Sequence, residues 1–322
     1  MHLSPATFRS CARSLTLLSL VLGAASLCSA GTITYNYTGN DFTYAVAPYT
    51  TSDSVTGSFT MASPLPPGLV GQPNQSVNPS SYNFSDGILS YTSTNGSDLF
   101  FDISTDTRGA ISGWLIQVCE GAVACGHPGS NSLLTEDVVP TVFDGVQVQG
   151  EGYETRSDSN PGTWTATLNG FQGGTSSAPT VIVGASIGEI TGTIGGNGSQ
   201  DYYSFFWGGG QFSATATITG ANPGASYAFS FNPSFSGCAN GPITLNSSDN
   251  FSYTYVSSPL LSAGQYCIGI DANSANDPAF ALTFNTPVEG VTTPEPSTFL
   301  PLSVGLGMVS VLRLARRSRK NS

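Results

Sequence analysis

The sequence predicts an all-β protein with two β-rich domains, placed between an N-terminal signal segment and a C-terminal apolar helix. Three observations predict this class. Only 9% of the 322 residues are charged, and Gly, Ser, Thr and Asn are abundant, a composition that favours strands and turns over exposed helices. Short segments of alternating apolar and polar residues recur between turn signals. Hydrophobic residues make up 39% of the chain, which can supply a core for each domain.

Residues 1–30 have the layout of a secretory signal peptide. A weakly basic start is followed by an apolar run and then by small residues that end at Ala30. We expect cleavage between Ala30 and Gly31. Lipidation of Cys28 is the alternative, but Leu27 stands where a lipoprotein signal carries a small residue.

Residues 31–169 are predicted to form the first β-rich domain. The expected strands, which show alternation or β-rich composition, are 32–37, 57–61, 88–91, 111–119 and 161–168. No segment of the body has a sustained helical period, so we expect at most one or two short helices. Residues 170–180 are rich in Gly, Ser and Thr and are predicted to be a linker.

Residues 181–287 are predicted to form the second domain. Gly192-Thr193-Ile194, the stretch 201–205 with 210–212, and the stretch 261–270 give this region a resemblance to the bacterial pre-peptidase C-terminal domain. The resemblance implies a small jelly-roll or immunoglobulin-like β-sandwich, and we expect both domains to be sandwiches. Aromatic residues alternate onto both sides of 201–207, which predicts a buried central strand; an exposed aromatic binding strip is the alternative.

Residues 288–322 contain three features in order. Pro294-Glu295-Pro296 is followed by an apolar helix over 299–314 and then by a basic tail over 313–320. The basic residues of this tail are Arg313, Arg316, Arg317, Arg319 and Lys320. They predict a membrane stop with a cytoplasmic C-terminus.

This order resembles the PEP-CTERM sorting signal. The resemblance implies a membrane helix as the transient tether and an exosortase-type processing enzyme that acts at the Pro-Glu-Pro motif. It also implies release or transfer toward the cell surface, often in bacteria that make exopolysaccharide. A plain C-terminal anchor is the alternative, because an anchor needs only the apolar and charged segments.

The body of the chain is strongly acidic. Residues 31–293 contain nineteen acidic residues and two basic ones, Arg108 and Arg156. Such a surface repels phosphate backbones and excludes nucleic acid as a partner. We expect the carboxylates to be scattered surface groups.

Four cysteines remain after removal of the signal peptide. An even number in an exported chain predicts two disulfides, and pairing within each region joins Cys119 with Cys125 and Cys238 with Cys267. Two other pairings and a four-thiolate zinc site are alternatives, but C-x-x-C spacing is absent.

Catalytic motifs are sparse, and we expect a protein that is not an enzyme. Gly184-Ala185-Ser186-Ile187-Gly188 matches the G-x-S-x-G nucleophile pattern, but the one histidine of the body, His127, lies in the other region. A glycoside hydrolase with a carboxylate pair in the first domain is the alternative.

No cofactor is expected; calcium binding by the second domain is the alternative. Asp201, Asp271 and Asp277 are predicted to lie at strand ends, where carboxylates supply the oxygen ligands that calcium prefers. A calcium-stabilised spacer is therefore a further alternative for the whole body.

Together these features predict an exported protein that is tethered to the inner membrane during transit and then reaches the cell surface or extracellular space. The expected role is adhesion, biofilm or exopolysaccharide architecture, or carbohydrate contact. Its expected partners are the processing enzyme, extracellular polysaccharide and other surface proteins.

Overall fold

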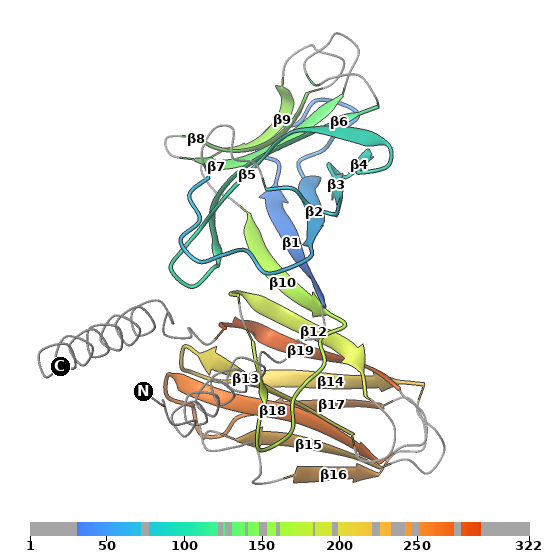
Figure 1. Ribbon diagram of the computed structural model, residues 1–322. Coiled ribbons are helices and arrows are strands. Elements are labelled where there is room, and N and C mark those ends of the chain that lie inside the picture. Colours follow the sequence, from blue (N-terminus) through green and yellow to red (C-terminus); the bar gives the residue numbers. More distant parts are fainter. Residues whose placement is uncertain are drawn as a thin grey trace, which may run out of the picture.

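The computed structural model describes the residues 31–71, 77–121, 125, 131–138, 141–147, 153–158, 162–182, 184–194, 199–220, 226–232, 242–246, 251–273 and 278–290. Every regular element within them is a β-strand, which confirms the predicted all-β class (Figure 1). None of these residues forms a helix with the length and apolar character needed to cross a membrane. The predicted signal peptide and the apolar helix of the sorting signal lie outside the described ranges.

The strands form three sheets. The largest has nine strands in the order β17-β14-β19-β12-β10-β1-β2-β3-β4. Its members are β1 (Thr32–Asp41), β2 (Ser54–Met61), β3 (Ser81–Ser85), β4 (Ser90–Thr92), β10 (Thr163–Asn169), β12 (Ile187–Thr193), β14 (Ser213–Thr219), β17 (Phe251–Val256) and β19 (Ala279–Val288). This nine-stranded sheet draws strands from both predicted domains.

Two five-stranded sheets complete the fold. The first runs in the order β5 (Gly96–Thr105), β6 (Ile111–Glu120), β7 (Ser132–Val138), β8 (Thr141–Gln147) and β9 (Tyr153–Asp158). The second runs in the order β11 (Thr180–Val181), β13 (Ser199–Trp207), β18 (Gly264–Asn273), β15 (Ser226–Asn232) and β16 (Pro242–Asn246). We refer to them as the β5–β9 sheet and the β13–β18 sheet.

The first layered unit is formed where the β5–β9 sheet covers one end of the nine-stranded sheet. Aromatic side chains fill the space between the layers. The rings of Tyr37 and Trp114 are 5.5 Å apart between centroids, and those of Phe59 and Phe101 are also 5.5 Å apart. Edge-on aromatic contacts of this kind add to the free energy gained from burial alone.

The second layered unit is formed where the β13–β18 sheet covers the other end of the nine-stranded sheet. The ring centroids of Phe205 on β13 and Phe284 on β19 are 5.6 Å apart. Those of Phe229 on β15 and Tyr253 on β17 are 5.5 Å apart. Strand β13 is buried on both sides, since Tyr202 and Tyr203 are 5% and 0% exposed. The predicted buried central strand is thus confirmed.

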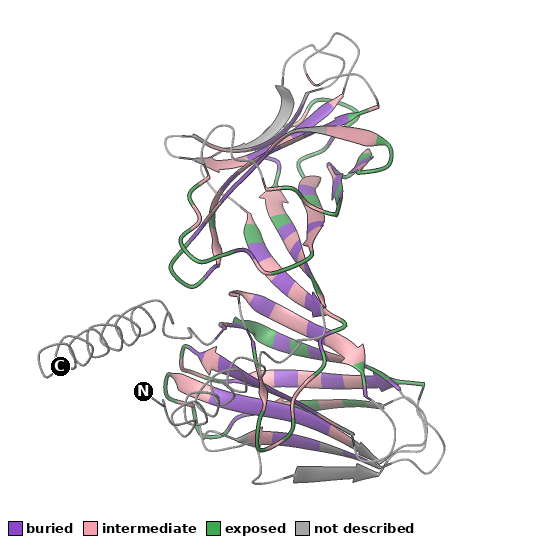
Figure 2. Cartoon of the chain, viewed as in Figure 1, coloured by how far each residue is buried: buried purple, intermediate pink, exposed green. Residues whose placement is uncertain are grey.

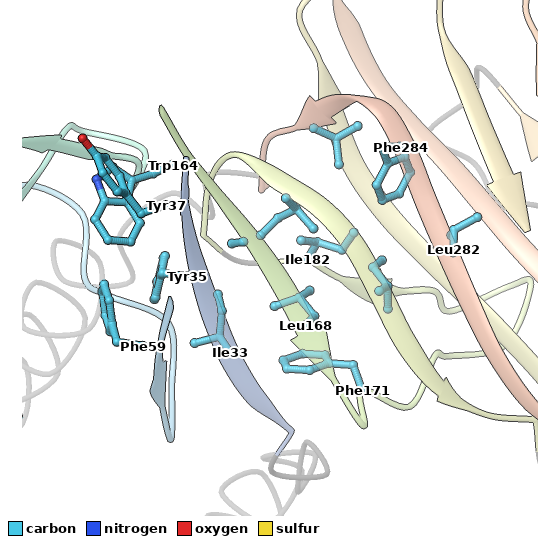
Figure 3. Close-up of a cluster of buried hydrophobic side chains, with 14 of the residues drawn as sticks. Ile33, Tyr35, Tyr37, Phe59, Trp164, Leu168, Phe171, Ile182, Leu282 and Phe284 are labelled. Atoms are coloured by element: carbon cyan, nitrogen blue, oxygen red, sulfur yellow. The ribbon is translucent and has the colours of Figure 1, made fainter. Parts of the chain in front are cut away.

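The two units share one sheet because β10 pairs with β12 in parallel. Figure 3 follows the buried side chains across this point, from Ile33 and Leu168 to Ile182 and Leu282. The core is therefore continuous between the units rather than divided into two.

Residues 170–180, the segment expected to be a linker, are fastened to β13. The amide of Gly173 donates to the Asp201 carboxylate over 2.6 Å, and the Tyr203 hydroxyl donates to the carbonyl of Phe171 over 2.7 Å. Gly174 exchanges two backbone hydrogen bonds with Tyr202. A side chain at Gly173 would collide with the backbone of Asp201, so this close approach requires glycine.

A second contact joins the units away from the shared sheet. The guanidinium of Arg108, in the turn between β5 and β6, lies 5.3 Å from the ring centroid of Phe206 on β13. Phe206 in turn exchanges backbone hydrogen bonds with Glu289, just after β19. Arg108 is one of two basic residues in the body, and a cation stacked on an aromatic ring stabilises such a contact.

The local pattern explains most strand positions, with one exception. The predicted strands at 32–37, 57–61, 111–119 and 161–168 correspond to β1, β2, β6 and β10. The segment 88–91 differs, because Ile88 is 46% exposed in a turn and the strand begins at Ser90.

The cause of this exception is the side chain of Asp86. Its carboxylate accepts the amides of Ile88 and Leu89 over 2.9 and 2.7 Å, which closes a turn in place of an extended strand. The same carboxylate accepts the hydroxyls of Tyr49 and Tyr91, both over 3.0 Å. Asp86 is fully buried, so the expectation that the acids are surface groups is wrong at this position.

Candidate functional site: the outer face of the nine-stranded sheet

The nine-stranded sheet has one buried side and one polar side. On β1, Ile33, Tyr35 and Tyr37 are buried against the core, whereas the intervening Thr34 and Asn36 are half-buried and point outward. Figure 2 shows the same alternation along β10. Successive side chains of a strand point to opposite faces, so this pattern produces one face made of Thr, Ser and Asn.

Cross-strand pairing aligns one outward residue from each of eight strands. In order from β17 to β3 these are Thr254, Thr215, Thr283, Glu189, Thr167, Thr34, Thr60 and Ser81. We call this set the hydroxyl row. Every member is exposed or half-buried. Neighbouring strands lie about 4.8 Å apart, so the row is about 34 Å long.

Hydrogen bonds between side chains hold the hydroxyl row in place. The Oγ1 atoms of Thr34 and Thr60 are 3.0 Å apart, and those of Thr215 and Thr254 are 2.9 Å apart. The Asn169 side-chain amide donates to Thr34 Oγ1 over 2.9 Å. Branching at Cβ also restricts the rotamers of threonine. A ligand would therefore meet donors and acceptors that are already ordered, which lowers the entropic cost of binding.

The hydroxyl row is almost free of charge in an acidic protein. Glu189 is its single ionisable member, and its carboxylate accepts the Thr283 hydroxyl over 3.4 Å. Hydroxyls and amides both donate and accept hydrogen bonds, as sugar hydroxyls do. The row therefore has the chemistry to bind a neutral polyhydroxyl ligand.

A buried polar network lies inside the first layered unit. Tyr37 donates its hydroxyl to the Asp144 carboxylate, with both oxygens 2.8 Å away, and accepts the Gly162 amide over 3.0 Å. Thr135 also hydrogen-bonds Asp144, and it accepts the indole N–H of Trp114 over 2.8 Å. Burial raises the pKa of Asp144 to about 6, opposed by the hydrogen bonds from Thr135 and Tyr37.

Asp144 is a structural group in this arrangement. It is 2% exposed, and both of its oxygens face the Tyr37 hydroxyl. A sugar substrate could not reach it, so its raised pKa does not support the carboxylate-pair alternative. Asp144 is a second position at which the expected surface acid is buried.

The three predicted calcium ligands are not brought together among the described residues. Gln200 pairs with Asp271 across the β13–β18 sheet, and Asp201 pairs with Ile270, so the two carboxylates point to opposite faces. Burial raises the pKa of Asp201, and the hydrogen bond from the Gly173 amide opposes this shift. Asp277 lies outside the described ranges. No group of three potential metal-ligating side chains occurs within those ranges.

The predicted disulfide between Cys119 and Cys125 is present, with the two Cα atoms 5.5 Å apart. It closes the loop that follows β6. Cys267 on β18 is also disulfide-bonded, and its predicted partner Cys238 lies outside the described residues.

Ser186, the centre of the G-x-S-x-G match, has a left-handed backbone with φ of 54°. Its amide donates to the Glu289 carboxylate, which holds this turn. Burial raises the pKa of Glu289, while the positive charge of Arg108 lowers it. The turn leads into strand β12, whereas a nucleophile elbow leads into a helix. His127 lies outside the described residues.

Of the predicted processing residues, only Gly31 is described. A side chain there would collide with the ring of Phe171, so the start of the body packs tightly against the segment after β10. Ala30, Pro294, Glu295, Pro296 and the basic tail from Arg313 to Lys320 lie outside the described ranges.

The hydroxyl row is not among the sites predicted from the sequence, although a signal for it is visible there. Threonine recurs at every second position in Thr163–Thr167 and Thr215–Thr219. Each segment predicts a strand with a polar face. Their alignment across eight strands could not be foreseen, because it depends on pairings between distant segments.

Comparisons with known proteins give little further information. No protein-family model matches the sequence, and no curated protein matches it. Among solved structures, one with similarity is described as the "Crystal structure of a Bacillus thuringiensis Cry1Da tryptic core variant". The match has 11% sequence identity and a TM-score of 0.17, and it covers 81% of this chain and 51% of that chain. The chain thus spans about half the length of that structure, and so low a TM-score does not indicate a shared fold.

Proposed function

We propose that the protein is a non-catalytic surface or matrix protein that contacts neutral polysaccharide through the hydroxyl row. The observation that carries this proposal is the alignment of seven hydroxyl side chains across eight strands of one sheet. A polysaccharide is long and flat enough to follow such a row. Many weak hydrogen bonds along it would act together, because each bond after the first forms at a high effective concentration.

The charge of the body supports a neutral ligand. Nineteen acidic residues against two basic ones repel polymers that carry uronic acids, sulfates or phosphates. Glu189 places a carboxylate within the row itself. An anionic chain lying there would meet this charge without a basic partner in the row.

We also propose that the chain is exported and sorted, because residues 1–30 have the layout of a signal peptide and residues 288–322 resemble the PEP-CTERM sorting signal. Both units would be jelly-roll or immunoglobulin-like sandwiches, displayed outside the cell after exosortase-type processing. The Cys119–Cys125 disulfide supports an oxidising location, because disulfides persist mainly outside the cytosol.

We expect loss of hydroxyl groups from the row to weaken polysaccharide binding by tenfold or more. The test variant carries Thr34→Val, Thr167→Val and Thr283→Val, which keep the side-chain shape and remove three hydroxyls from three strands. Binding is measured by affinity electrophoresis and calorimetry with soluble neutral glucans, mannans and galactans. A uronic-acid polymer is the charged comparison.

The matched control replaces the same three threonines with serine, which keeps each hydroxyl. It should bind within about threefold of the unaltered protein. Equal binding by the valine and serine variants would place the contact elsewhere. Preference for the uronic-acid polymer, or no binding to any neutral polysaccharide, would contradict the proposal.

The sorting part of the proposal predicts the mass of the mature chain. In protein recovered from the cell envelope and culture medium of its own host, we expect a chain that begins at Gly31 and ends near 294–296. Intact-mass spectrometry measures both ends at once. A chain that still carries Arg313–Ser322 in the inner membrane would reduce the sorting signal to a simple anchor.

A further inference from the structure

Among the described residues, the three sheets have six edge strands, and five of these strands carry features that discourage pairing with another chain. β4 has three residues and β11 has two. β9 contains Glu154, Arg156 and Asp158 in a strand of six residues. β5 has two register irregularities, and β16 begins with Pro242. Short length, charge, bulges and proline are the known means by which proteins protect sheet edges.

Strand β17 has none of these features. Its sequence, FSYTYV, contains no charge, proline or glycine, and it pairs with β14 in an unbroken register. Within the part of the chain that the structure describes, it is the end strand of the nine-stranded sheet. Ser252, Thr254 and Val256 are exposed, with Val256 50% accessible to solvent. Aromatic and β-branched residues give this strand a high tendency to pair.

The hydrogen-bonding direction of β17 shows which backbone groups face the free edge. The amide of Ser257, directly after the strand, donates to the carbonyl of Phe212 at the β14 side over 2.8 Å. Backbone groups of successive residues point alternately to the two sides of an antiparallel strand. The amides and carbonyls of Ser252, Thr254 and Val256 therefore point away from β14, toward the edge.

We propose that β17 is an assembly edge, which pairs antiparallel with β17 of a second copy of this chain. Thr254 would lie opposite Thr254 of the other copy, and Ser252 opposite Val256. The residues that offer backbone groups to the edge are then opposite one another, and about six backbone hydrogen bonds form.

This register also keeps the two faces of the sheet matched. Tyr253 would lie opposite Tyr255 on the buried side, where each ring already contacts Phe229 on β15. Paired aromatic residues on neighbouring strands stabilise a sheet. Thr254 is an end member of the hydroxyl row, so the row would continue directly into that of the second copy.

The lack of charge on β17 suits it to a second copy of this acidic chain, because pairing there brings no carboxylate against another. The body is strongly acidic, so two copies repel each other over most of their surfaces, whereas β17 has no charged side chain. Because salt screens repulsion between exposed charges, we expect association to strengthen as ionic strength rises. The inference does not depend on which ligand the hydroxyl row binds.

The test uses the exported chain with a single new cysteine. In Thr254→Cys, the two new thiols would meet across the dimer axis, with Cα atoms about 5.5 Å apart, a separation that a disulfide spans. Thr56→Cys on β2 is the matched control, since Thr56 is an exposed threonine on the same face but away from β17. Under mild oxidation we expect covalent dimer at least tenfold faster with Thr254→Cys.

Sedimentation velocity of the unaltered chain and of Thr254→Pro completes the test. Proline removes an outward amide that has no role in the β14 pairing, so the fold should survive while dimer formation weakens at least tenfold. Equal cross-linking rates in the two cysteine variants would overturn the proposal. So would a dimer that persists in Thr254→Pro, or a chain that remains monomeric at high salt and high concentration.

Discussion

Phe212→Ala is expected to lower the free energy of unfolding by about 3–5 kcal/mol, the range found when a large aromatic side chain is removed from a core. Phe212 is fully buried between the layers of the second unit. Its ring lies 4.6 Å from that of Phe231, 5.3 Å from Trp207 and 5.5 Å from Phe205, measured between centroids. Alanine would leave a cavity that three neighbouring rings cannot fill without moving.

Chemical denaturation followed by tryptophan fluorescence measures this loss. Tyr44→Ala is the control, because it truncates an aromatic side chain that is 55% exposed. The control should change the free energy of unfolding by less than about 1 kcal/mol. Similar losses in the two variants would mean that Phe212 is not a core residue of the second unit.

The free energy of unfolding is expected to fall by about 3 kcal/mol between pH 4 and pH 8 because of Asp144, and Asp144→Asn should abolish this fall. The pKa of Asp144 is raised from 3.8 to about 6 in the folded protein, so the fold favours the protonated carboxyl. Between these two values the folded state binds more protons than the unfolded state. Stability therefore falls as the pH rises from about 4 to about 6, by about 1.4 kcal/mol for each pKa unit.

The measurement is the free energy of unfolding from pH 4 to pH 8, compared between the unaltered protein and Asp144→Asn. The difference between the two curves isolates Asp144, because the other carboxyls contribute to both. Asp41→Asn removes an exposed carboxyl from β1, the strand that carries Tyr37, and controls for the loss of one negative charge. Parallel curves for the unaltered protein and Asp144→Asn would show that the raised pKa has no effect on folding.

Local alternation was sufficient to predict strands such as β1 and β10. In each, apolar residues at every second position form a buried face, and this signal does not depend on the rest of the chain. The failure at 88–91 is also local, because the Asp86 side chain competes with strand hydrogen bonding through two backbone amides. Composition alone cannot reveal a competition of this kind.

The nine-stranded sheet could not be predicted from the sequence in the same way. It depends on the parallel pairing of β10 with β12, which places strands of both regions in one layer. The same limit applies to the buried acids. Asp144 resembles any surface carboxylate in the sequence, and its burial follows from contacts with Tyr37 and Thr135 on other strands.

The order of strands in the nine-stranded sheet sets the order in which the chain can fold. Asn36 on β1 bonds Thr167 on β10 across 131 residues, and Glu189 on β12 bonds Thr283 on β19 across 94. Such distant pairings fold slowly, because a long loop must close before any contact forms. Because the chain is synthesised from its N-terminus, the centre of this sheet can be completed only after β19 has been made. We therefore expect its apolar strands to stay exposed to aggregation until that point in synthesis.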